Sequence, residues 1–85
     1  MNLFKRFPKL VGFKMRITAQ IKFSSQKQKV EGFGDRRYLV YILSGKDDEG
    51  AMSEFVVMMS REIGVSTGRI HYVGKQGNSY IFEVE

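Results

Sequence analysis

Basic side chains recur between residues 16 and 37 in a pattern that suits contact with phosphate groups. Positions 24–29 read SSQKQK, and two adjacent arginines follow at 36 and 37. Hydroxyl, amide and basic side chains are the groups that contact phosphate oxygens in protein–nucleic acid complexes. A tyrosine at 41 adds a ring on which a base can stack, provided that it shares a face with the cations. The predicted nucleic-acid-binding residues are Arg16, Lys22, Lys27, Lys29, Arg36, Arg37 and Tyr41.

The formal net charge of +5 is concentrated in the first half of the chain. Residues 1–46 hold 11 basic and 2 acidic side chains, whereas residues 47–85 hold 3 basic and 7 acidic ones. A basic half attracts an anionic partner such as RNA, DNA or a membrane surface. The same charge also suits a solvated surface that keeps a small protein soluble. Composition leaves both interpretations open.

Other residue types that carry chemistry are sparse. Asp47, Asp48 and Glu49 form a weak candidate metal site, but they lack the alternating ligands of a calcium loop. Their place before a predicted helix favours a simpler role at its positive end. His71 is the single histidine and has no predicted partner. Because no general base with a positioning partner can be found, we expect a protein that is not an enzyme and has no cofactor.

Gly74 and Gly77 form a GxxG tetrad with a lysine inside it. KH domains clamp a nucleic-acid backbone with such a loop between two helices. Here the flanking segments alternate as strands do, so the tetrad predicts a hairpin turn.

Length and composition set further bounds. Eighty-five residues suffice for one small domain. The chain has no cysteine, which excludes disulfides and fits a reducing compartment such as the cytoplasm. No apolar run approaches the roughly 20 residues of a membrane span. Residues 1–14 mix lysines with aromatics around Pro8, and we expect them to form a basic N-terminal arm beside a single domain over 15–85.

Hydrophobic spacing predicts the elements that position these residues. Residues 16–23 alternate strictly between apolar and polar, as a half-buried strand does. Residues 38–43 are apolar throughout, which predicts a central strand. Residues 51–63 place Met52, Phe55, Val56, Met59 and Ile63 at helical spacing, with Gly64 as the C-cap. Residues 69–73 and 79–85 are two more strands. The connection over 24–36 is predicted to be a loop.

These elements predict an α+β fold. We expect a two-layer sandwich in the order strand, strand, helix, strand, strand, with a four-stranded mixed sheet and one main helix packed on one face.

The stretch from Arg16 to Glu85 resembles the YggU-like proteins, a group of small proteins of unknown function. The resemblance lies in the alternating first strand, the Ser/Lys-rich loop and the VEGFGD segment over 30–35. Glu49-Gly50 before the helix and Ile63-Gly64-Val65 at its end also match. The helix start lacks the Lys and Asn of that family, so the chain resembles a diverged member. The resemblance implies the fold and no site.

Three functional hypotheses follow from the sequence. The first is a non-enzymatic module that binds nucleic acid weakly, with RNA as the expected partner. The second is a protein–protein interaction or self-association module that uses the open sheet face and the N-terminal arm. The third is a metal-assisted enzyme built on the acidic cluster.

Overall fold

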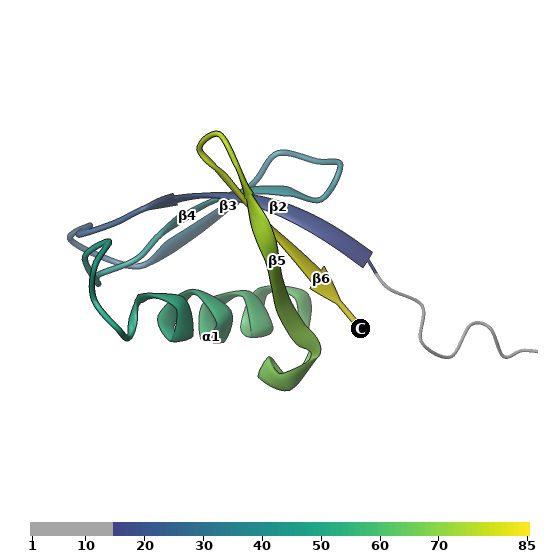
Figure 1. Cartoon of the computed structure of the whole chain (residues 1–85). Helices are drawn as coiled ribbons and strands as arrows, with labels where there is room; N and C mark the ends of the chain where they lie inside the picture. The colour runs from purple at the N-terminus through teal and green to yellow at the C-terminus, as the bar shows by residue number, and fades with distance from the viewer. Residues whose placement is uncertain (1–14) are drawn as a thin grey trace, which may run out of the picture.

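The computed structural model describes residues 15–85, so the predicted arm over 1–14 lies outside the described residues. This part of the chain forms five strands, one α-helix and one short 3-10 helix (Figure 1). In chain order the elements are β2 (Met15–Lys22), β3 (Lys29–Gly32), β4 (Arg37–Tyr41), α1 (Ala51–Ile63), η1 (Thr67–Arg69), β5 (Ile70–Gln76) and β6 (Ser79–Val84).

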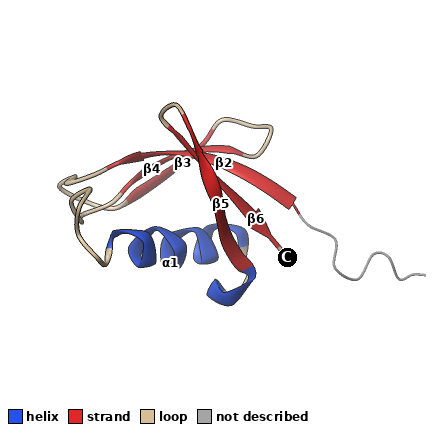
Figure 2. Ribbon diagram, in the orientation of Figure 1, coloured by secondary structure: helices blue, strands red, loops and turns tan. Residues whose placement is uncertain are grey.

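The strands form one mixed sheet in the order β3-β4-β2-β6-β5. Strands β2 and β4 run parallel, and the other neighbouring pairs are antiparallel (Figure 2). The α+β class and the helix on one face are confirmed, but the sheet has five strands where the sequence predicted four. The central strand is β2, so the prediction of a central strand over 38–43 was wrong: the apolar β4 lies beside the centre, between β3 and β2.

The strand missed by the sequence prediction, β3, lies inside the connection over 24–36. It has four residues, and Val30 is its one partly buried apolar side chain. Val30 pairs with the fully buried Val40 across an antiparallel ladder. A segment this short shows too little alternation to be distinguished from a polar loop.

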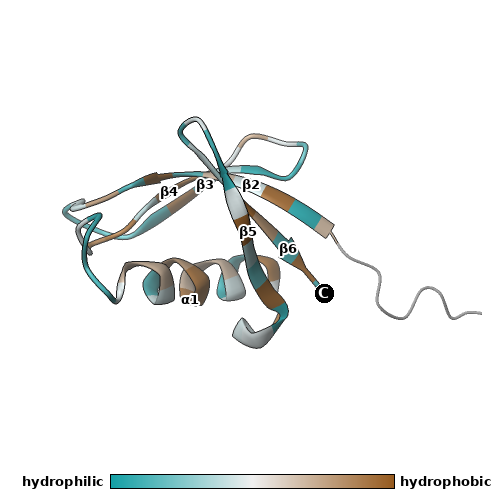
Figure 3. Ribbon diagram, in the orientation of Figure 1, coloured by the Kyte–Doolittle hydropathy of each residue, from teal (hydrophilic) through white to brown (hydrophobic). Residues whose placement is uncertain are grey.

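Strand β2 follows its sequence pattern closely. Ile17 and Ala19 are fully buried, whereas Arg16, Gln20 and Lys22 are exposed on the other side. Figure 3 shows hydrophobic and hydrophilic residues alternating along the strand. The alternation arises because successive side chains of a strand point to opposite faces of the sheet.

Helix α1 has the predicted bounds and covers one face of the sheet (Figure 1). Phe55 is fully buried and stacks on Phe82 of β6, with ring centroids 4.6 Å apart. The helix ends at Gly64, which has the left-handed φ of 77° predicted for a C-cap. The buried stripe differs in part from the prediction: Ala51 and Met58 are buried. The predicted residues Met52, Val56 and Ile63 are only partly buried around the core.

The opposite face of the sheet, here called the open face, is covered by no element of residues 15–85 (Figure 1). Within the same residues, no helix is both long enough and apolar enough to cross a membrane.

Candidate functional site

Three of the predicted binding residues form one row across the open face. Lys22 of β2 is in register with Tyr41 of β4, and Tyr41 is in register with Lys29 of β3. Residues in register point to the same side of a sheet. Along β4, Tyr41 follows the buried Val40 and so points to the opposite face from it. The side chain of Tyr41 therefore lies on the open face, between two lysines.

Lys29 is held within this row by two contacts. Its Nζ lies 2.9 Å from Oε2 of Glu31 and 6.0 Å from the centre of the Tyr41 ring. The hydrogen bond that Lys29 donates to the Glu31 carboxylate, followed by the charge of that carboxylate, raises the pKa of Lys29 above its ordinary value. This cation is thus partly neutralised by its own neighbour.

Arg16 lies apart from the row, at the beginning of β2. Its Nη2 donates a 2.8 Å hydrogen bond to Oε2 of Glu83 on β6. Lys22 lies six positions after Arg16 on the same strand, which corresponds to roughly 20 Å. The structure therefore separates Arg16 from the row, although Arg16 lies on the same strand only two residues before Thr18, the register partner of Arg37.

Four predicted cations form no ion pair within residues 15–85: Lys22, Lys27, Arg36 and Arg37. Lys27 is exposed in the loop after β2. The backbone of Arg36 is held in place, because its carbonyl oxygen accepts a 3.0 Å hydrogen bond from the Thr18 N–H. Cations without a carboxylate partner are the ones whose charge is available to a phosphate.

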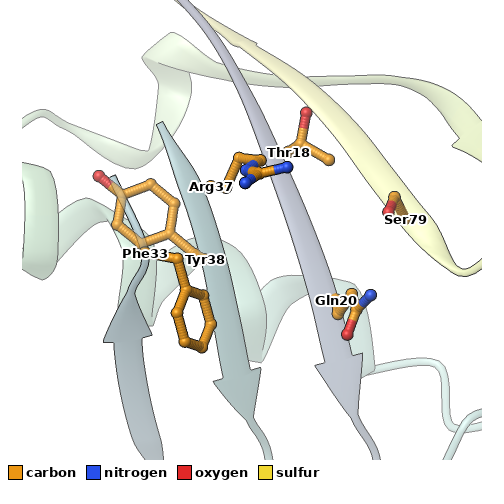
Figure 4. Close-up of a pocket in the computed structure, with 6 residues that line it drawn as sticks. All are labelled: Thr18, Gln20, Phe33, Arg37, Tyr38 and Ser79. Atoms are coloured by element: carbon orange, nitrogen blue, oxygen red, sulfur yellow. The ribbon is translucent and has the colours of Figure 1, made fainter. Parts of the chain in front are cut away.

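Beside the row, the open face has a hollow that extends across β4, β2 and β6. The hollow has a volume of about 240 Å³. Figure 4 shows the Arg37 side chain extending from β4 toward β2, with Phe33 and Ser79 on opposite sides of the group. The lining residues are Thr18, Gln20, Phe33, Arg37, Tyr38 and Ser79.

A tight turn positions Phe33 and Arg37 at this hollow. The Phe33 N–H donates to the Arg37 carbonyl at 2.9 Å, and the Arg37 N–H donates to the Gly34 carbonyl at 3.0 Å. Three successive residues have left-handed backbones: Gly34 at φ 80°, Asp35 at 52° and Arg36 at 60°. Left-handed conformations are costly for residues with a Cβ. The turn therefore holds a conformation that its sequence does not favour.

Phe33 was missed by the sequence reasoning, although a signal was present. A large aromatic between Gly32 and Gly34 is unusual in a loop, and the structure leaves 59% of it exposed. Gln20, Thr18 and Ser79 were also missed as site residues. Their role depends on strand register, which brings β6 beside β2.

Glu54 of α1 forms hydrogen bonds with the loops that follow β2 and β4. Its carboxylate accepts hydrogen bonds from the N–H groups of Leu43 and Ser44 at 2.7 and 3.0 Å, and from Ser44 Oγ and Gln28 Nε2 at 2.7 Å each. Loss of hydration alone would raise the pKa of Glu54. The four hydrogen bonds outweigh it and lower the pKa to about 2. The sequence analysis did not single out this carboxylate.

Among the remaining candidates, Asp48 and His71 have structural partners. Oδ2 of Asp48 accepts a 2.7 Å hydrogen bond from the Gly45 N–H within a turn. In residues 15–85 no group of three or more acidic or histidine side chains is placed to hold a metal ion. Asp47, Asp48 and Glu49 therefore do not form such a group. His71 lies 3.5 Å from the Glu85 carboxylate. The hairpin between β5 and β6 is confirmed, but its turn is only Gly77-Asn78, because Gly74, Lys75 and Gln76 continue β5 and pair with β6.

No protein-family model, curated protein or solved structure matches the chain. The resemblance to the YggU-like proteins therefore stays a prediction.

Proposed function

We propose that the open face binds single-stranded nucleic acid weakly, with RNA as the expected partner, and that the protein is a binding module without enzymatic activity. The observation that carries the proposal is the Lys22–Tyr41–Lys29 row, which places one aromatic ring between two cations on a sheet face that no element of residues 15–85 covers. Aromatic platforms flanked by cations are how sheet surfaces bind single strands, since every base offers a ring to stack.

The unpaired cations supply the second support. Lys22, Arg37 and the two loop residues Lys27 and Arg36 have no carboxylate partner in the described residues. Together with Lys29 they provide for about 3–5 phosphate contacts, which predicts a slope of roughly −2 to −3.5 for log affinity against log salt. Binding of this kind depends on the backbone, so we expect no strong sequence preference.

Fluorescence anisotropy with single- and double-stranded RNA and DNA across a salt series tests the proposal. Replacing Arg36 and Arg37 by alanine removes two contacts and is expected to flatten the slope for a single strand by about 1.4. If the unaltered protein binds none of these nucleic acids at low salt, the proposal is contradicted.

A matched control separates site from net charge. Arg61→Ala with Arg69→Ala changes the net charge equally, but Arg61 lies on α1 and Arg69 precedes β5, away from the row. We expect the control to keep the slope. An equal change in both double variants would mean that only overall charge matters.

The same samples distinguish self-association. Sedimentation at several concentrations, without nucleic acid, is expected to show a monomer. A dimer that excludes the oligonucleotide would favour the interaction-module hypothesis instead.

A further inference from the structure

We infer that the hollow beside Phe33 takes one unpaired nucleotide, with its base against the Phe33 ring and its phosphate on Arg37. This inference rests on the proposed function, because the bound strand supplies the nucleotide.

The size of the hollow fits one ring-sized group. Its volume of about 240 Å³ lies below the range of about 300–1,000 Å³ typical of sites that enclose whole drug-sized ligands. A base with its sugar left outside is the part of a nucleic acid that suits such a space. A base in a duplex is stacked on both sides and cannot enter it.

Phe33 supplies the stacking surface. It is 59% exposed, and the backbone hydrogen bond to Arg37 fixes its position in the turn. An exposed aromatic held at the rim of a hollow gains contact area when a flat ring lies against it. The left-handed backbones of Asp35 and Arg36 in the same turn fit a conformation retained for the placement of this ring.

Arg37 supplies the phosphate contact. It is exposed, it has no carboxylate partner in residues 15–85, and its side chain extends over the hollow (Figure 4). The planar guanidinium donates two parallel hydrogen bonds to a phosphate, which a lysine at this position would not do.

Three of the four remaining lining residues have small or flexible polar side chains without charge, and the fourth, Tyr38, packs partly against the core. Thr18, Gln20 and Ser79 contribute two hydroxyls and one amide, each able to donate and to accept a hydrogen bond. Within the described residues, none of these three side chains forms a hydrogen bond. Groups of this kind recognise the polar edge of a base without demanding a charge.

The test uses the absence of tryptophan from the chain. Phe33→Trp introduces a single indole that still stacks, so its fluorescence is expected to fall on titration with a uridine hexanucleotide and, at higher concentration, with uridine 5′-monophosphate. Val57→Trp is the control, because Val57 lies exposed on α1, on the other side of the sheet. Its fluorescence is expected to stay constant.

A second variant measures the contribution of the ring. Phe33→Ala is expected to bind the hexanucleotide roughly 5- to 100-fold more weakly, the range that stacking of one base gives. Its salt slope is expected to stay unchanged, because no charge is lost. The variant should also lose most of its preference for single over double strands.

The outcomes separate this inference from the proposed function. Hexanucleotide binding by anisotropy, without indole quenching and with full affinity in Phe33→Ala, would overturn the hollow and leave the proposed function standing. Quenching by the mononucleotide without hexanucleotide binding would support the hollow and contradict the proposed function. Absence of both signals at low salt would overturn both.

Discussion

The two faces of the sheet come from the same five strands, but the side chains of one face are buried and those of the other are largely exposed. On the covered face, Ile17, Val40 and Phe82 are fully buried against α1. On the open face, most residues are polar or charged, with Leu39 and Ile81 among them, and the carboxylates of Glu31 and Glu83 partly neutralise the cations beside them. Burial stabilises the domain on one side only, so the other side can carry charge at little cost to folding. Substitutions on the two faces should therefore affect different properties.

The largest effect is expected on the covered face. Phe55→Ala removes the ring that stacks on Phe82, and large cavities of this kind cost about 3–5 kcal/mol of unfolding free energy. Urea denaturation measures the loss. Val57→Ala is the control, because Val57 lies on the same helix but its side chain is exposed. It should change stability by less than about 0.5 kcal/mol. Similar losses in both would mean that the stacked pair is not central to the core.

The next largest effect is expected at Glu54, whose carboxylate links the helix to the loops after β2 and β4. The pKa of Glu54 is about 2 in the folded chain and near 4.5 when unfolded, so its stabilisation is present above pH 4.5 and is lost as pH falls toward 2. Allowing for the partial exposure of this group, we expect a loss of about 1–2 kcal/mol over that window. Denaturation at a series of pH values checks it.

Glu54→Gln is expected to be less stable at neutral pH and to lose much of this pH dependence. Glu62→Gln is the matched control, because Glu62 is exposed on the same helix and forms no hydrogen bond through its side chain within residues 15–85. If both variants kept the acid sensitivity of the unaltered protein, Glu54 would not be its source.

On the open face, the effect should appear in binding rather than in stability. Tyr41→Ala removes the ring between the two lysines and is expected to weaken single-strand binding about 5- to 10-fold, whereas Tyr41→Phe keeps the affinity. Tyr72→Ala removes an exposed tyrosine whose ring contacts Phe82 of the covered face, and it should leave affinity unchanged. Anisotropy measures all three variants, and equal losses in the two alanine variants would contradict a role for the row.

The sequence predicted the elements whose spacing is regular. Strand β2 alternates over eight residues and α1 repeats over thirteen, so their buried faces could be recognised without a structure. Residues 38–43 are apolar at every position, which leaves the facing of Tyr41 undefined. Only the register with β2 fixes it on the open face.

The parts of the site that were missed depend on contacts between distant residues. Glu54 meets Gln28 across 26 positions of the chain, and no local pattern shows this. Phe33 becomes a site residue only because the turn after β3 returns the chain to β2, where β6 also pairs. Sequence reasoning thus found the cations, whose chemistry is intrinsic, and missed the hollow, whose walls come from four separate segments.

The smallest effect concerns the turn itself. Asp35 has a φ of 52° without being a glycine, and it contributes to neither the row nor the lining of the hollow. Asp35→Gly removes the Cβ that disfavours this backbone, while the added freedom of the unfolded chain offsets part of the gain. We expect a net stabilisation of about 0.5 kcal/mol by urea denaturation. Gly34→Ala, in which a Cβ is added at φ 80°, should instead destabilise the domain by about 1 kcal/mol.

If Asp35→Gly is stabilised but binds the hexanucleotide more weakly, the rigidity of the turn is part of how Phe33 and Arg37 are presented. If its affinity is unchanged, the hydrogen bonds that Arg37 forms with Phe33 and Gly34 suffice to hold the site.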